Sequence, residues 1–259
     1  MTLSTAACRT GRNYQDVGPR YEGAPSRAAA ADPARGDTLR IASFNIEFAL
    51  RPDSALAVFR AESALARMDV VLLQEVDESA TRRIAGGLGL GYVYYPAIFR
   101  NRSSKDFGNA VLSRWPIIAD SKVILPHRSW YGGSQRTATA ATIRIADRFV
   151  RVYSTHLGTP ADITPSRRRQ QIRAIIRDAE PHRLVIIGGD LNSSVTGEVA
   201  RDAGYLWPTE KGVRTTRLGR WDHIFVKGLT VPANGSGTIS NGRGTSDHLP
   251  VWAIVLMNR

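Results

Sequence analysis

The apolar run Leu184–Ile187 leads directly into Gly188-Gly189-Asp190-Leu191-Asn192, and this junction strongly constrains the fold. Four apolar residues, three of them β-branched, that end at a Gly pair predict a buried β-strand. Asp190 and Asn192 stand two residues apart, so in extended chain both side chains lie on one face at the strand's carboxyl end. Open α/β sheets bind ligands at that end. The segment predicts either a turn that caps the next helix or a site for a divalent cation or phosphate oxygen.

Several other predicted strands also have a polar side chain at one end. Leu39–Ile46 alternates as a strand does and carries Asn45 near its end, and the buried strand Asp69–Glu75 ends on a carboxylate. The remaining polar strand ends are His156, Asp222, Asp247 and His248. Each one alone is compatible with a cap or a turn, but burying so many uncompensated polar groups would be costly. A shared metal-bearing site explains them together.

Strand and helix patterns alternate along residues 38–259 and predict one α/β domain, since no seam or fixed-period repeat divides the segment. Apolar spacing predicts helices at Ser54–Arg67, Ser79–Leu88, Pro165–Ala179 and Val195–Ala203. The other strands are predicted at Tyr92–Phe99, Gly108–Ser113, Ile117–Leu125, Arg136–Ala146, Phe149–Thr155, Trp221–Val226 and Leu249–Leu256.

Composition narrows the class of protein. Hydrophobic residues make up 42% and charged residues 22% of the chain, as in globular proteins with a sizeable core. No apolar run approaches the ~18 residues needed for a membrane helix. The formal net charge of +12 favours a polyanionic partner such as nucleic acid or an anionic lipid surface, although solubility alone is another explanation.

Residues 1–37 differ in composition from the rest and predict a flexible leader outside the fold. The segment is rich in Ala, Gly, Pro and Arg and has little periodicity, so we expect its removal to change stability and activity little. Thr5-Ala6-Ala7-Cys8 is similar to the end of a bacterial lipoprotein signal, but the basic start and apolar stretch of such a signal are absent. A cell-envelope or secreted location is therefore one expectation and a cytoplasmic location the other. Because Cys8 is the only cysteine, an intramolecular disulfide is excluded.

Seven short motifs, in order along residues 40–255, resemble those of the endonuclease/exonuclease/phosphatase superfamily typified by deoxyribonuclease I. They are Ser43-Phe44-Asn45-Ile46, Leu73-Gln74-Glu75-Val76, Gly108-Asn109-Ala110-Val111-Leu112-Ser113, Ser154-Thr155-His156-Leu157, Gly189-Asp190-Leu191-Asn192, Trp221-Asp222-His223-Ile224-Phe225 and Ser246-Asp247-His248-Leu249-Pro250. The resemblance implies an α/β (α+β) four-layer sandwich of two packed mixed β-sheets flanked by helices. It also implies Mg²⁺- or Mn²⁺-dependent cleavage of a phosphoester by activated water.

The resemblance further implies a role for each motif residue. Glu75 would be the main metal carboxylate, and Asn45 and Asp247 would help to place the ion or its waters. A sparse ligand set suits Mg²⁺, which keeps several waters. The catalytic residues would be His248 paired with Asp222 at the scissile phosphate, Asp190 at the attacking water, Asn192 on a phosphate oxygen, and His156.

Substrate contacts are expected from residues that match cleft positions or lie in basic loops. Asn109 and Arg136 match cleft-facing positions of the family, although a surface salt bridge is an equal alternative for Arg136. Arg102 lies in the basic loop Arg100–Lys105, which is suited to follow a nucleic-acid backbone. His223 faces away from Asp222 in its strand and is expected to be structural.

These features together predict a monomeric, metal-dependent phosphodiesterase that acts on DNA or RNA. The alternative is a phosphatase or phospholipase C-type enzyme that acts on a phosphoinositide or a sphingomyelin-like lipid. A non-enzymatic binding module on the same fold is disfavoured because every expected catalytic position is filled.

Overall fold

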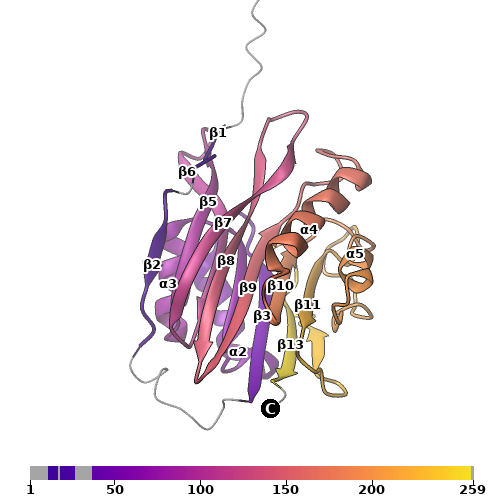
Figure 1. Ribbon diagram of the computed structural model, residues 1–259. Helices are drawn as coiled ribbons and strands as arrows, with labels where there is room; N and C mark the ends of the chain where they lie inside the picture. Colours follow the sequence, from indigo (N-terminus) through magenta and orange to yellow (C-terminus); the bar gives the residue numbers. More distant parts are fainter. Residues whose placement is uncertain (1–10, 17, 27–36, 258–259) are drawn as a thin grey trace, which may run out of the picture.

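Two β-sheets packed face to face form the centre of the computed structural model, which describes residues 11–16, 18–26 and 37–257 (Figure 1). Helices cover the outer faces of both sheets, so the architecture is the predicted four-layer sandwich. Among the described residues, none of the helices combines the length and apolar character required to cross a membrane.

The first sheet has the strand order β1-β5-β6-β4-β3-β13-β12, and β2 also pairs with β5. Only β3 and β4 run parallel; the other pairs are antiparallel. Its strands are β1 (Gly11–Asn13), β2 (Tyr21–Gly23), β3 (Thr38–Asn45), β4 (Val70–Val76), β5 (Gly91–Arg100), β6 (Lys105–Ser113), β12 (Ser236–Thr238) and β13 (Val251–Leu256).

The second sheet has the strand order β11-β10-β9-β8-β7, with β9 and β10 parallel. Its strands are β7 (Ile117–Arg128), β8 (Gln135–Ile145), β9 (Arg148–His156), β10 (Leu184–Asp190) and β11 (Asp222–Lys227). The predicted strands are confirmed with small shifts in their ends. The short β12 was not predicted, because its sequence Ser-Gly-Thr has no apolar pattern.

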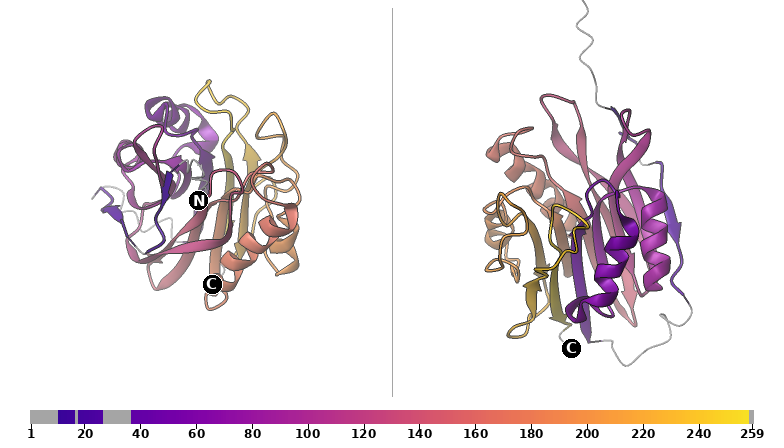
Figure 2. Two further views of the ribbon diagram at one scale, coloured as in Figure 1. Left: turned by 90° about the horizontal axis from the view of Figure 1, so that it is seen from above. Right: turned by 180° about the vertical axis from the view of Figure 1, so that it is seen from behind.

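The helices are α2 (Pro52–Ala61), the 3₁₀ turn η2 (Ser63–Leu65), α3 (Glu78–Leu88), α4 (Pro165–Ala179) and α5 (Glu198–Asp202). One apolar cluster fills the space between the sheets, a second lies under α2 and α3, and a third lies under α4 and α5. Figure 2 shows the two helical layers on opposite sides of the molecule. The predicted helix Ser54–Arg67 ends earlier, at Ala61, and continues as the 3₁₀ turn.

The strand register brings the polar strand ends to one edge of the sandwich. Asn45 pairs with Gln74 across the parallel strands β3 and β4, and Asp190 pairs with His156 across β9 and β10. Because β11 runs antiparallel to β10, its first residue Asp222 lies opposite Asp190. The carboxyl ends of parallel strands share one edge of a sheet, so local strand patterns place these side chains near each other.

Buried polar side chains cross between the two sheets near this edge. The Gln74 amide donates to Ser154 Oγ at 3.0 Å, and Ser154 Oγ donates to the Leu73 carbonyl at 2.9 Å. Asn109 Nδ2 donates to the Thr137 carbonyl at 2.8 Å, and Thr139 Oγ1 donates to the Asn109 carbonyl at 2.7 Å. These bonds satisfy buried polar groups and fix the two sheets relative to one another.

Part of the predicted leader belongs to the fold, and the prediction that residues 1–37 lie outside it is wrong for β1 and β2. Both strands pair with the edge strand β5. The local composition concealed this, because a three-residue edge strand takes its stability from a partner strand rather than from its own pattern. Gly11 allows the close approach, since a Cβ there would lie 2.1 Å from the Phe99 carbonyl oxygen. Cys8 lies outside the described residues.

Candidate active site

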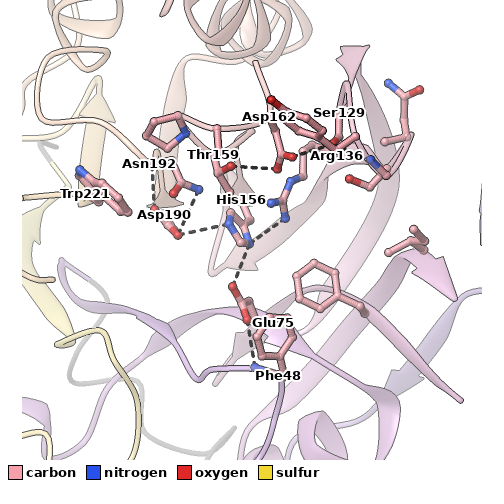
Figure 3. Close-up of a pocket in the computed structure, with 18 of the residues that line it drawn as sticks. Phe48, Glu75, Ser129, Arg136, His156, Thr159, Asp162, Asp190, Asn192 and Trp221 are labelled. Carbon is pink, nitrogen blue, oxygen red and sulfur yellow. Dashed lines mark hydrogen bonds and ion pairs between the residues drawn. The ribbon is translucent and has the colours of Figure 1, made fainter. Parts of the chain in front are cut away.

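A pocket of about 620 Å³ opens at the edge where the polar strand ends meet (Figure 3). Glu75 and Phe107 come from the first sheet, and Arg136, His156 and Asp190 come from the second. Asp247 and His248, from the loop before β13, complete the polar part of the lining. The pocket is therefore built from both sheets, and its chemistry depends on how they pack together.

Glu75 turns into the pocket because β4 is irregular at this residue. The register with β6 shifts between Gln74 and Val76, and Glu75 has a φ of 59°, in the left-handed region that is unfavourable for a residue with a side chain. Its carboxylate accepts hydrogen bonds from the Phe48 amide at 3.0 Å and from Asn45 Nδ2 at 3.2 Å. Burial raises the pKa of Glu75, and the bond from Asn45 counteracts part of that rise.

Asp190 lies at the centre of the hydrogen-bond network. Oδ1 accepts a hydrogen bond from the backbone amide of Asn192 at 2.7 Å, and Oδ2 accepts one from Asn45 Nδ2 at 3.1 Å. Gly189 precedes it with a φ of 147°, and a Cβ there would lie 1.8 Å from the Thr155 carbonyl oxygen, so the Gly pair is a requirement of the site. Burial raises the pKa of Asp190 above its ordinary value, since the side chain is 1% exposed.

His156 is held in one neutral tautomer by its neighbours. Burial and the positive charge of Arg136 lower its pKa well below the ordinary value. Arg136 Nη1 lies 3.1 Å from His156 Nδ1, and because a guanidinium only donates, Nδ1 is the acceptor. The ring proton therefore resides on Nε2, which lies 3.2 Å from Asp190 Oδ2.

His248 has the opposite protonation state. Burial alone would lower its pKa, but the Asp222 and Asp190 carboxylates outweigh burial and raise the pKa to about 10. Nδ1 donates to Asp222 Oδ2 at 2.8 Å, and Nε2 points toward the pocket, 3.7 Å from Asp190 Oδ2. Asp222 is buried behind the ring, so His248 presents a proton to the pocket.

The structure brings together most of the predicted site residues. Asn45, Glu75, His156, Asp190, Asn192, Asp222 and His248 form one contact network, and Asp247 lines the same pocket. In this structure, the side-chain Nδ2 of Asn192 donates to the Leu157 carbonyl at 2.9 Å, and the residue has a φ of 50°. Its side chain is nevertheless part of the pocket wall.

Two predicted substrate contacts lie elsewhere. Asn109 is 2% exposed and lies on the face of β6 that packs against the second sheet. Its side-chain Nδ2 donates to the Thr137 carbonyl in that sheet. Arg102 is exposed in the turn between β5 and β6 and is not among the residues that line the pocket, although Arg100 is. Arg136, in contrast, lines the pocket as predicted and contacts His156.

Two sets of side chains have donor atoms suited to a metal ion. Among the described residues, one buried group of ligand atoms lies within 4.8 Å of one another, in Asp190, Asp222 and His248. In this group His248 Nδ1 already donates to Asp222 Oδ2, which leaves Nε2 as the ring nitrogen that faces the pocket. Glu75 and Asp247 offer two carboxylates at the pocket, the hard oxygen donors that Mg²⁺ and Mn²⁺ prefer. Asn45 is buried beside them, where Nδ2 donates to Glu75 and Oδ1 accepts from the Glu47 amide.

Several pocket residues were not predicted from the sequence. Phe48, Phe107 and Trp221 form apolar parts of the wall, and Figure 3 labels Phe48 and Trp221. Asp162 accepts hydrogen bonds from Ser129 Oγ at 2.6 Å and Thr159 Oγ1 at 2.9 Å and so joins two loops. All but Phe107 lie outside the strands, where periodicity gives no information about facing direction.

A comparison with known families agrees with this geometry. The family model described as "Endonuclease/Exonuclease/phosphatase family" matches residues 42–248 of the chain. This segment includes every polar residue of the network. The chain belongs to the endonuclease/exonuclease/phosphatase family. Members of this family hydrolyse phosphoester bonds.

Solved structures of the endonuclease/exonuclease/phosphatase fold superimpose on this chain. The enzyme from Beutenbergia cavernae DSM 12333 gives a TM-score of 0.69 at 21% identity and covers 86% of this chain and 72% of that chain. The structure of D. rerio TDP2 complexed with single strand DNA product gives a TM-score of 0.64 at 18% identity. The match covers 84% of this chain and 98% of that chain. The human Nocturnin catalytic domain with bound sulfate anion gives a TM-score of 0.66 at 18% identity. The match covers 91% of this chain and 97% of that chain. A search of curated protein sequences found no match.

Proposed function

We propose that this protein is a divalent-metal-dependent phosphodiesterase that cleaves DNA or RNA with an activated water molecule. One observation carries the proposal: Glu75, His156, Asp190 and His248 come from separate strands and loops of both sheets and converge on one pocket. The four side chains differ in protonation, with one neutral and one charged imidazole beside two carboxylates. Paired groups of this kind suit acid–base chemistry on a phosphoester.

Glu75, Asn45 and Asp247 would hold the metal ion, with Mg²⁺ or Mn²⁺ as the expected species. The bound ion would neutralise charge on the phosphate and polarise the phosphoester. Burial raises the pKa of Glu75, so without an ion this carboxylate is destabilised in its charged form. A divalent cation would remove that penalty, which supports Glu75 as the principal ligand.

Asp190 is suited to take a proton from the attacking water. Its raised pKa brings it closer to neutral pH, where a carboxylate is a more effective general base. Hydrogen bonds from Asn45 Nδ2 and the Asn192 backbone amide hold its two oxygens, and His156 Nε2 lies 3.2 Å from Oδ2, so the base is oriented before substrate binds. His156 acts through Asp190 and is a positioning residue in this scheme.

His248 is suited to stabilise negative charge on the phosphate. The bond of His248 Nδ1 to the Asp222 carboxylate keeps the imidazole ring protonated and fixes its plane. The N–H at Nε2 therefore faces the pocket. Arg136 also lines the pocket, where it adds a second cation and donates to His156 Nδ1. Both groups lower the energy of a developing phosphoryl charge without rearranging during the reaction.

The wall beside Glu75 favours a substrate that carries bases. The Arg100 guanidinium lies 4.1 Å from the Phe48 ring centre and 5.5 Å from that of Phe107. Aromatic and guanidinium faces side by side stack with nucleobases, and the net charge of +12 attracts a phosphate backbone. The D. rerio TDP2 structure with a single strand DNA product shows that a protein of this fold holds such a ligand.

Hydrolysis of a phosphoinositide or sphingomyelin-like lipid is the second candidate. Tyr131 is 80% exposed and Leu218 is 77% exposed, and both belong to the pocket lining. Exposed apolar side chains around a phosphate site suit an amphipathic substrate at a lipid surface.

The decisive experiment compares cleavage of plasmid DNA, RNA, inositol phosphates and sphingomyelin by the purified protein with Mg²⁺ or Mn²⁺, each with an EDTA control. We expect nucleic acid to be cleaved and EDTA to abolish the reaction.

Glu75→Gln should lower the rate by more than about 100-fold, because it removes the principal carboxylate of the metal site. His248→Ala should lower it by about 10²–10⁴-fold through loss of the charged donor.

Glu78→Gln is the matched control, because it makes the same chemical change in α3, where Glu78 pairs with Arg82 away from the pocket. Wild-type rates in Glu75→Gln or His248→Ala, with folded protein by circular dichroism, would refute the proposal. Cleavage of the lipid but not of nucleic acid would replace it with the second candidate. A monomeric state and a cell-envelope location through Cys8 stay predictions from the sequence.

A further inference from the structure

The N-terminal strands connect the two sheets close to the pocket. We call residues 11–16 and 18–26 the N-terminal strap. β1 and β2 pair with β5 of the first sheet, while Arg20 donates from Nε and Nη2 to the carboxylate of Asp120 in β7 of the second, at 2.7 and 2.6 Å. The family match begins at residue 42, so the strap lies outside the matched segment.

Asn13 links the strap to the connection between β7 and β8, which we call the hairpin loop (residues 129–134). Asn13 Nδ2 donates to the Gly133 carbonyl at 2.8 Å, and Asn13 Oδ1 accepts from the Gln135 amide at 2.8 Å. Both ends of the side-chain amide are therefore used on the backbone of one hairpin. An amide supplies a donor and an acceptor together, which neither a carboxylate nor an apolar side chain of similar size can do.

The hairpin loop forms one wall of the pocket. Ser129, Tyr131, Gly132 and Ser134 line the cavity, and the next two residues, Gln135 and Arg136, continue the wall at the start of β8. Arg136 in turn contacts His156 Nδ1, and Nε2 of the same ring lies 3.2 Å from Asp190 Oδ2. A displacement of the hairpin would therefore reach the phosphate-binding guanidinium and the orientation of the catalytic carboxylate.

Asp162 holds the same loop from the opposite side. It accepts from Ser129 Oγ at 2.6 Å, and its carbonyl accepts from the Trp130 amide at 3.2 Å (Figure 3 shows the contact of Ser129 with Asp162). Since the loop is held at both sides, losing the Asn13 bonds alone should loosen it without unfolding the domain. Asn13 thus has a specific mechanical role that is separable from general stability.

We propose that Asn13 is a positioning residue of the active site: its side-chain amide fixes the hairpin loop, and with it Arg136, against the pocket. The kinetic part of this inference rests on the proposed function, because it assumes that the phosphoester is cleaved in this pocket. The structural part, that Asn13 restrains residues 129–134, is independent of any activity.

The test compares wild type with Asn13→Leu, which keeps the size but removes both hydrogen bonds. Tyr14→Phe is the matched control, because it removes a neighbouring hydrogen bond from the strap to Asp106 and leaves the hairpin contacts intact. Backbone amide exchange of the peptide that covers residues 129–134 is followed by mass spectrometry. Steady-state kinetics use bis(p-nitrophenyl) phosphate with Mn²⁺.

In Asn13→Leu we expect faster exchange in residues 129–134 and a fall in kcat/KM of about 10- to 100-fold with a raised KM. A general loss of folded enzyme would instead lower kcat and leave KM unchanged. Unchanged exchange in the hairpin loop, or equal effects in Tyr14→Phe, would overturn the positioning role. If wild type cleaves no phosphoester, the proposed function fails, while the exchange result still decides whether Asn13 restrains the loop.

Discussion

Three buried histidines show how individual residues acquire different chemistry in this protein. His156 is neutral because it is buried beside Arg136, and His248 is charged because Asp222 and Asp190 outweigh its burial. His223 is adjacent to Asp222 but faces the other way, as expected from strand alternation. It contacts Trp207 Nε1 and the carbonyls of Ser193 and Arg220, which confirms its prediction as a structural histidine.

His223 makes stability depend on pH. Burial lowers its pKa to about 4, so the folded state keeps the ring neutral while the unfolded state takes up a proton below about 6.5. Its contribution is therefore fully present above pH 6.5 and is lost as pH falls toward 4. We expect the free energy of unfolding to decrease by about 3 kcal/mol over this range, measured by urea denaturation at a series of pH values.

The contribution of His223 is isolated by comparing pH slopes rather than stabilities. His223→Gln should unfold more easily at pH 7.5 but show a shallower decline between pH 6.5 and 4 than wild type. His127→Gln, which changes a half-exposed histidine that contacts Gln170, should keep the wild-type slope. Equal slopes in His223→Gln and wild type would show that His223 is not the titrating group.

At the scale of secondary-structure elements, the N-terminal strap changes the boundary of the domain. β1 and β2 cover part of the edge strand β5, and Tyr21 packs on Tyr94 with ring centres 5.8 Å apart. An exposed strand edge is a site for association with other chains. The strap is thus structural, in contrast to the expectation from composition that the whole of residues 1–37 could be removed without effect.

Deletion of residues 1–26 should destabilise the protein. Each hydrogen bond of the strap contributes about 0.5–1.5 kcal/mol net, and the entropy cost of ordering the strap offsets much of their sum, so we expect a loss of about 3 kcal/mol in the free energy of unfolding. The melting temperature should then fall by roughly 6–12 °C, as measured by calorimetry. Light scattering should also show increased association, because the deletion uncovers the edge of β5.

A chain that lacks only residues 1–10 retains both strands and is the control for this deletion. An unchanged melting temperature after removal of residues 1–26 would mean that the strap contributes nothing measurable to the fold. In that case the pairing with β5 would be too weak to restrain the hairpin loop through Asn13.

At the scale of the whole molecule, the net charge of +12 should control how the protein binds its substrate. Each phosphate contact releases counterions, so affinity for a polyanion falls steeply with salt. For about four to six contacts with a single strand, we expect a slope of about −3 to −4 in a plot of log affinity against log salt concentration. Fluorescence anisotropy with a labelled single-stranded oligonucleotide and Ca²⁺ in place of Mg²⁺ measures this slope.

A small substrate provides the comparison for the salt dependence. The KM for bis(p-nitrophenyl) phosphate should change little over the same salt range, because it contacts the pocket but not the surrounding basic surface. A slope near zero for the oligonucleotide would argue against nucleic acid as the substrate. It would favour the lipid candidate, whose binding responds to the composition of the membrane surface.

The sequence by itself determined an α/β domain with polar residues at its strand ends, and the resemblance of its motifs implied the layered arrangement. The period of two in the strands and the polar residue at each strand end are local patterns, and parallel pairing places Asn45 beside Gln74 and Asp190 beside His156. Only the tertiary structure decided which residues join this edge from elsewhere: Asn13 reaches the hairpin loop from 120 positions away in the chain, while Arg102 and Asn109 lie off the pocket. Protonation states were likewise decided by burial and charged neighbours, because a pKa depends on surroundings that distant segments supply.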